Sequence, residues 1–140
     1  MKNIISLLIR FVPRKYLQLF SHIPLKLYAF TMKGNNVECP VCEHKFKKFL
    51  PYGRLNPREN ALCPNCLALE RHRLMYLYLK EKTNFFTQNH QLLHIAPEYC
   101  FINRFEKLEN IEYTTADIES PLAKVKMNIE EIQYPDNSFD

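Results

Sequence analysis

The sequence predicts a mixed α/β protein built from three consecutive segments. Two Cys-x2-Cys pairs mark a small module, and the order strand, helix, strand, strand follows them. A basic segment precedes the first cysteine. We therefore expect an amphipathic helical arm over residues 1–36, a ribbon-like cysteine module with its following helix over 37–83, and the first half of a parallel sheet, about three strands, over 84–140.

The arm is predicted to form short helices over residues 3–32, because Pro13 and Pro24 can each sit in the first turn of a helix. Residues 1–37 carry six basic and no acidic side chains, whereas the whole chain has a net charge of only +4. The apolar run at residues 4–9 is too short to span a bilayer. Two uses of the arm remain open, docking on the following segment or lying on an anionic membrane.

The composition excludes several classes of protein. Hydrophobic residues make up 46% of the chain, which excludes a disordered or collagen-like protein. Only two glycines are present, so a glycine-rich nucleotide loop is not expected. No export signal is recognised, which predicts a cytoplasmic protein, peripheral to the membrane if the arm binds lipid. In that reducing compartment, clustered cysteines hold metal more often than they form disulfides.

The four clustered cysteines follow the pattern C-x2-C-x20-C-x2-C and are Cys39, Cys42, Cys63 and Cys66. Two such turns can direct four thiolates at one tetrahedral ion, with Zn–S distances near about 2.3 Å. Four thiolates leave no open coordination position, so the pattern predicts one structural zinc. The alternatives are that His44 replaces one ligand, or that the cysteines are unrelated buried residues.

Around these cysteines, residues 37–66 are predicted to form short strands and loops, after a turn at residues 34–36. Three lysines alternate here with two phenylalanines: Lys45, Phe46, Lys47, Lys48 and Phe49. One interpretation is a basic and aromatic surface for nucleic acid. The other is a solvated strand face whose phenylalanines point inward.

A helix is predicted over residues 67–82, with one apolar stripe formed by Leu67, Leu74, Leu77 and Tyr78. Glu70 and Arg71 fall inside that stripe, and charges on a buried face need partners. Either they pair with the cysteine module, or Arg71 or His72 reaches toward a substrate groove. Arg73 is expected to face solvent.

The last segment predicts strands over residues 91–96, 111–116 and 124–129, with a helix over 100–108 between the first two. Asp117 follows the second strand, where an acid can accept hydrogen bonds from a ribose diol. A turn-capping aspartate is the alternative interpretation. Cys100 is expected to be a packing residue without a chemical role.

Five fragments, in this order, resemble one enzyme family: CPVCEHKFKKFLPYG, LCPNCLALERHRLMYLYL, LLHIAPE, YTTADI and YPDNSFD. The combination is similar to class I S-adenosylmethionine-dependent methyltransferases of the type 11 kind that carry an N-terminal zinc-ribbon-like module. The resemblance covers residues 37–140 and leaves out the arm. It implies a Rossmann-like sheet, S-adenosylmethionine as cofactor, and methyl transfer to an acceptor that the sequence does not identify.

The resemblance also implies which residues contact the cofactor. The first strand's turn, which would support the methionine end, contains His94, Ala96, Pro97 and Glu98. Asp117 matches the ribose-binding acid, and Asn128 stands where the family commonly has an Asp near the adenine amino group. An amide oxygen can accept the same hydrogen bond without bringing a charge.

The family sheet has the order 3-2-1-4-5-7-6, and residues 84–140 supply only 3-2-1 by this resemblance. We therefore expect weak or no activity from these 140 residues alone. A second chain that completes the sheet is a candidate partner, because the first strand would otherwise be an open edge. The alternative function is a non-enzymatic zinc-ribbon module whose basic residues 1–33 contact nucleic acid or an anionic membrane.

Overall fold

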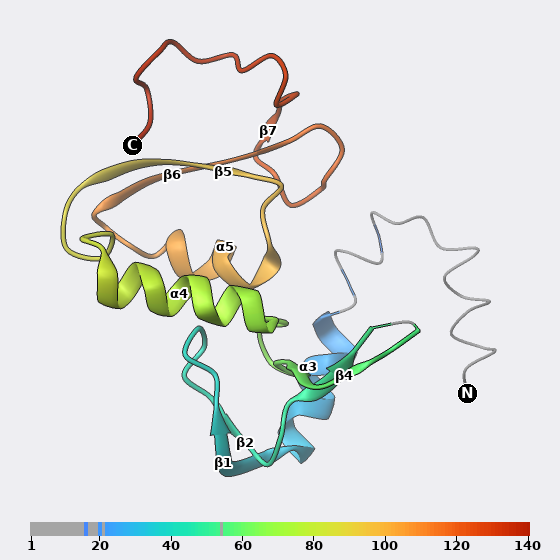
Figure 1. Cartoon of the computed structure of the whole chain (residues 1–140). Helices are drawn as coiled ribbons and strands as arrows, with labels where there is room; N and C mark the ends of the chain where they lie inside the picture. The colour runs from blue at the N-terminus through green and yellow to red at the C-terminus, as the bar shows by residue number, and fades with distance from the viewer. Residues whose placement is uncertain (1–15, 17–19, 21, 54) are drawn as a thin grey trace.

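The computed structural model describes residues 16, 20, 22–53 and 55–140 (Figure 1). The predicted helix start at Pro13 lies outside these residues. The described part is a mixed α/β structure with two small antiparallel sheets and one parallel sheet of three strands. Pro24 lies in the first turn of helix α3, His22–Thr31, as predicted. No helix among the described residues combines the length and apolar content needed to cross a membrane.

The cysteine region is built from two antiparallel strand pairs. Strand β1, Lys33–Glu38, pairs with β2, Lys45–Phe46. Strand β3, Leu50–Tyr52, pairs with β4, Arg58–Leu62. The short strands and loops predicted for this region are therefore present.

The turn predicted at residues 34–36 is wrong, because these residues lie inside β1. Gly34 is needed there because Lys47 approaches it closely, and not because the chain turns. A Cβ atom at Gly34 would lie 2.6 Å from Lys47 Cγ and 2.8 Å from the Lys47 backbone nitrogen. The pairing of β1 with β2 is also irregular between Lys33 and Val37.

Helix α4, Glu70–Lys82, begins three residues later than the predicted helix. Leu67 cannot start it, because that residue has a φ of 64° in the turn that follows the second cysteine pair. The predicted apolar stripe is also wrong. Leu74 and Tyr78 are exposed, and His72 and Tyr76 are the buried residues of α4.

The third region has the predicted order of elements. Strand β5, His90–Ile95, is followed by helix α5, Tyr99–Phe105, and by strand β6, Ile111–Asp117. Strands β5 and β6 are parallel and pair over six consecutive positions, from His90 with Ile111 to Ile95 with Ala116. Strand β7 is shorter than predicted, since only Val125–Lys126 pair with the end of β6.

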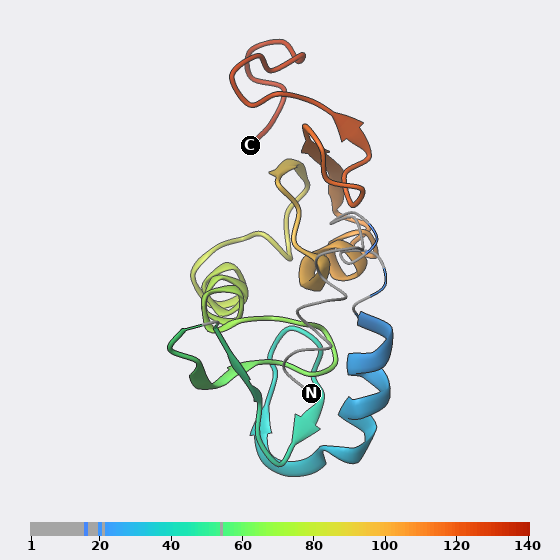
Figure 2. The ribbon, with the colours of Figure 1, turned by 90° about the vertical axis from the view of Figure 1, so that its right-hand side faces the viewer.

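The helices α4 and α5 lie between the parallel sheet and the cysteine region (Figure 1). Figure 2 shows the three layers one above another, with the sheet at the top and the two antiparallel pairs at the bottom. One core of buried residues runs through these layers, from Cys39 and Phe46 in the cysteine region to Phe101 and Phe105 on α5.

Candidate functional site

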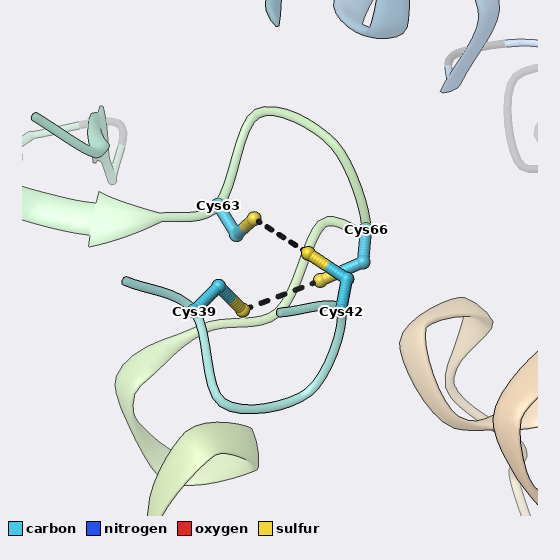
Figure 3. A group of neighbouring side chains, drawn as sticks. All are labelled: Cys39, Cys42, Cys63 and Cys66. Atoms are coloured by element: carbon cyan, nitrogen blue, oxygen red, sulfur yellow. Dashed lines mark hydrogen bonds between the residues drawn. The ribbon is translucent and has the colours of Figure 1, made fainter. Parts of the chain in front are cut away.

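The four predicted ligand cysteines come together in one cluster (Figure 3). Their Sγ atoms all lie within 4.8 Å of one another. Cys39 Sγ lies 3.6 Å from Cys66 Sγ, and Cys42 Sγ lies 3.7 Å from Cys63 Sγ. These distances are far longer than a disulfide bond, so the sulfurs are not paired covalently.

The two Cys-x2-Cys turns position their sulfurs in the same way. The residue after each pair, Glu43 or Leu67, adopts a left-handed φ near 60°. Glu43 donates its N–H to the carbonyl of Cys39 over 2.7 Å, and Leu67 donates to the carbonyl of Cys63 over 3.0 Å. Each turn therefore curls around its first cysteine and directs both sulfurs to the same side.

The cluster fits a tetrahedral metal ion. Four sulfurs at about 2.3 Å from a zinc ion are separated by about 3.8 Å, close to the two sulfur–sulfur distances above. Hydrogen bonds from the other thiols, the strongest from Cys39, lower the pKa of Cys42 far below its ordinary value. The pKa of Cys66 is raised, chiefly by its hydrogen bond with Cys39. Without a cation the sulfurs therefore cannot all ionise together, and a divalent ion removes that conflict.

His44 does not replace a cysteine ligand. It is exposed, and its Nδ1 lies 2.7 Å from the carbonyl oxygen of Cys42.

The alternation of the neighbouring lysines and phenylalanines reflects strand packing, because Phe46 and Phe49 are both buried. Arg73 covers Phe49, with its guanidinium carbon 4.3 Å from the ring centroid.

Arg73 does not face solvent, contrary to prediction. Its guanidinium donates to the carbonyl oxygens of Ala61 at 2.8 Å, Ala68 at 3.1 Å and Asn60 at 3.3 Å. Glu70 pairs with Arg58 on β4, which confirms the predicted pairing with the cysteine region for that residue. Both side chains thus join α4 to the cysteine region.

The turn after β5 contains the predicted cofactor residues His94, Ala96, Pro97 and Glu98. Ala96 has a φ of 51° and bends the chain out of the strand, and Pro97 is buried. Glu98 Oε2 lies 2.7 Å from His94 Nε2, and His94 Nδ1 lies 2.7 Å from the Tyr113 hydroxyl. A carboxylate only accepts, so Nε2–H donates to Glu98 and Nδ1 accepts from Tyr113.

His72 reaches the same carboxylate from α4. Its Nδ1 accepts the backbone N–H of Leu69 over 3.1 Å, and its Nε2 lies 3.5 Å from Glu98 Oε1. Hydrogen bonds from His72 and His94 hold the pKa of Glu98 well below its ordinary value. His72 therefore does not line an open groove, and Arg71, which is exposed, lies beside it with Nε 3.1 Å from Nε2.

Cys100 packs beneath this network, as expected for a residue without a chemical role. Its sulfur lies 3.5 Å from His72 Nδ1. Burial raises the pKa of the Cys100 thiol to about 12, so the thiol stays protonated at neutral pH. A protonated, buried thiol is a poor nucleophile.

Asp117 and Asn128 both cap turns. Asp117 Oδ1 accepts the backbone N–H groups of Glu119 at 2.8 Å and Ser120 at 2.6 Å. Asn128 is exposed, and its Oδ1 accepts the N–H of Glu130 over 3.1 Å. Asp117 therefore caps a turn, as the alternative interpretation predicted. It lies at the end of β6, where the acid was expected.

The parallel pairing brings the Ala96 turn and Asp117 to the same edge of the sheet. Ala96 donates its N–H to the carbonyl of Ala116 over 2.9 Å, one residue before Asp117. A hollow of about 400 Å³ beside Asp117 is lined by Ser120, Lys124 and Lys126, among others. His94 and Glu98 do not line this hollow.

Comparisons with models of protein families, with curated proteins and with solved structures find no match to this chain. The arrangement that the structure defines is a four-cysteine centre suited to a metal ion, attached through α4 to a parallel α/β sheet.

Proposed function

We propose that this chain is a zinc-containing, S-adenosylmethionine-dependent methyltransferase unit, in which a Rossmann-like sheet binds the cofactor. The observation that carries the proposal is the placement of the Ala96 turn and Asp117 at the carboxyl ends of the adjacent parallel strands β5 and β6. Open parallel sheets bind their ligands at that edge. The sequence resemblance, which assigns the methionine end to the Ala96 turn and the ribose to Asp117, is the second support.

In this proposal the zinc ion has a structural role. Four thiolates close the coordination shell, so the ion cannot activate water or bind an acceptor. Its thiolates fix the two cysteine turns, the second of which precedes α4, and α4 contacts Glu98 through His72. The zinc centre therefore supports the Ala96 turn at a distance. Methyl transfer mainly requires that the methyl donor and its acceptor be held in line, so no particular catalytic side chain is needed.

The proposal includes a second chain that adds a strand beside β5. Among the described strands only β6 pairs with β5. Asp140 already pairs at the open edge, since its N–H donates to the Gln91 carbonyl over 3.0 Å and its Oδ2 accepts the Gln91 N–H over 2.8 Å. Beyond that point an apolar hollow lined by Leu79, Leu93 and Ile95 follows the edge. A parallel strand with apolar side chains fits it.

Titration of the zinc-loaded chain with S-adenosylmethionine, followed by amide chemical shifts, tests the cofactor proposal. We expect weak binding, with a dissociation constant on the order of millimolar. The largest shift changes should occur at the amides of Ala96 and Asp117. Removing the carboxylate with Asp117→Ala should weaken the binding, because the ribose hydroxyls lose their acceptor.

Asp136→Ala is the matched control, since Asp136 is an exposed aspartate in a different turn. It should leave the affinity unchanged. If S-adenosylmethionine moves no amide at the carboxyl ends of β5 and β6, or if both variants weaken binding equally, the cofactor proposal is wrong.

A further inference from the structure

Helix α3 has apolar side chains on two opposite faces. At about 100° per residue, His22, Leu25 and Ala29 share one face, and Ile23, Leu27 and Phe30 share the other. The first face points inward, since Ala29 is buried in the core and the His22 ring stacks on Tyr99 with centroids 4.7 Å apart. A helix that only docked on the protein would be polar on its second face.

The second face lies in solvent. Its exposed fractions are 49% for Ile23, 73% for Leu27 and 71% for Phe30. Phe20, just before the helix, is 57% exposed. We call Ile23, Leu27 and Phe30 the outer stripe of α3. Figure 2 shows α3 along one side of the cysteine region, with α4 on the opposite side. No other element labelled in Figure 1 lies outside α3 in that view.

A positive charge lies beside the outer stripe. The ammonium group of Lys33 lies 4.3 Å from the centroid of the Phe30 ring, whereas that of Lys26 lies on the inner side of α3, 5.8 Å from the centroid of the Tyr99 ring. The sequence of residues 1–37 contains six basic and no acidic side chains. An apolar stripe with a cation beside it complements a surface that is apolar inside and negatively charged outside.

We propose that the outer stripe of α3 inserts into the headgroup region of an anionic membrane and that Lys33 contacts its phosphates. The helix then lies in the plane of the membrane surface while its inner face stays on the protein. This inference is independent of the proposed methyltransferase activity. It assigns the chain a peripheral membrane contact that keeps the parallel sheet at the opposite end of the molecule (Figure 1).

The side chains of the outer stripe favour lipid over nucleic acid. Binding of single strands depends on aromatic faces on which bases stack. Within the outer stripe only Phe30 offers such a face, whereas Ile23 and Leu27 are aliphatic and can insert between acyl chains. The lysines and phenylalanines of residues 45–49 offer no alternative stacking surface, because Phe46 and Phe49 are buried.

Flotation of the zinc-loaded chain with vesicles tests the proposal. We expect binding to vesicles of phosphatidylcholine mixed with phosphatidylglycerol, weaker binding to pure phosphatidylcholine, and a decrease as salt is raised. The double variant Leu27→Ser, Phe30→Ser should reduce partitioning at least about tenfold, because two large apolar side chains no longer leave water. Lys33→Gln should reduce it about fivefold on the anionic vesicles only.

The matched control is Leu74→Ser, Tyr78→Ser on α4, two side chains that are 70% and 58% exposed on the other side of the molecule. This control should bind vesicles as the unchanged chain does. Zinc content, measured on every variant, reports whether the fold is intact. The proposal is overturned if the α3 double variant still binds, if the α4 control loses binding to the same extent, or if the chain binds single-stranded DNA but no vesicles.

Discussion

The cysteine region, residues 33–69, and the parallel sheet, residues 90–126, differ in what holds them together. In the cysteine region β2 spans two residues and β3 spans three, and each sheet has only two strands. In the parallel sheet β5 and β6 pair over six consecutive positions. The sheet also covers a cluster of stacked aromatic rings on α5, where Phe101 and Phe105 lie 5.1 Å apart.

Two-stranded sheets of this length are marginal in water. The cysteine region therefore needs a further source of stability. A metal ion held by the four sulfurs at its centre would supply it. The parallel sheet and α5 contribute apolar and aromatic side chains to the shared core, and their packing does not depend on such ligands. Metal binding should therefore control the folding of the cysteine region, and side-chain packing should control that of the parallel sheet. Helix α4 joins the two regions.

The largest effect is expected from Cys63→Ser, which removes one ligand of the metal centre. Structural zinc sites contribute about 10–16 kcal/mol of apparent binding free energy in small zinc modules, and a lost ligand forfeits much of it. Metal analysis should show one zinc per unchanged chain and less than one in the variant. Hydrogen exchange should show β1 and β2 unprotected before β5 and β6.

Cys100→Ser is the control for the same experiment, because Cys100 is a buried cysteine outside the cluster. It should keep the full zinc content. A metal-free chain whose β1 and β2 amides remain protected would contradict the proposed role of the centre.

A second prediction concerns the aromatic core. Phe101 is fully buried, packs on Phe105 and meets the His72 ring edge-on. Phe101→Ala should lower the free energy of unfolding by about 3–5 kcal/mol through the cavity that it leaves. Zinc content should stay at one per chain. Urea unfolding measures the change, with Leu55→Ala, at a 93% exposed position, as a control expected to stay within about 0.5 kcal/mol.

The four-cysteine cluster could be predicted from the sequence because the spacing within each cysteine pair is a local property. Cys39 and Cys42, like Cys63 and Cys66, are fixed by turns that close within five residues. The order of the parallel strands could also be predicted, since a strand, a helix and a second strand in succession usually fold with the two strands adjacent and parallel.

The buried face of α4 could not be predicted, because helical periodicity assumes that apolar side chains point inward. Here the inward side of α4 packs Tyr76 into the aromatic core but also faces backbone carbonyls and a carboxylate. Arg73 donates to Asn60, Ala61 and Ala68, and His72 meets Glu98, which lies 26 positions further along the chain. Apart from Ala68, these partners lie at least 12 positions from the residues that they contact, so the local periodicity carries no sign of them. It favoured Leu74 and Tyr78 as the buried residues instead.

A third prediction tests the joint between the two regions. Glu98→Gln should lower the free energy of unfolding by about 1–2 kcal/mol, allowing for its partial exposure, because two histidines lose a charged acceptor. The folded-state pKa of Glu98 lies below its ordinary value of 4.5, so its contribution is complete above that pH and is lost as the pH falls further.

Urea unfolding of the unchanged and Glu98→Gln chains at pH 7 and pH 5 measures this difference. It should not shrink between the two values, because both lie above 4.5. Glu119→Gln, at an exposed glutamate without a histidine partner among the described residues, is the control and should have little effect. A difference that has vanished by pH 5 would exclude an ionised Glu98 as the acceptor.

The smallest effect is expected from Arg58→Gln, although its ion pair with Glu70 also joins α4 to the cysteine region. The pair is bidentate, with distances of 3.0 and 3.3 Å, and Arg58 lowers the pKa of Glu70 to about 2. Both side chains are largely in water, where solvent and salt screen the attraction.

Arg73→Gln breaks hydrogen bonds to three carbonyls at the same junction and should destabilise the chain more than Arg58→Gln does. Urea midpoints at low and high salt should therefore move for Arg73→Gln under both conditions, and for Arg58→Gln only slightly at low salt. Equal shifts for the two variants would mean that charge pairing, and not satisfaction of the module's carbonyls, holds α4 in place.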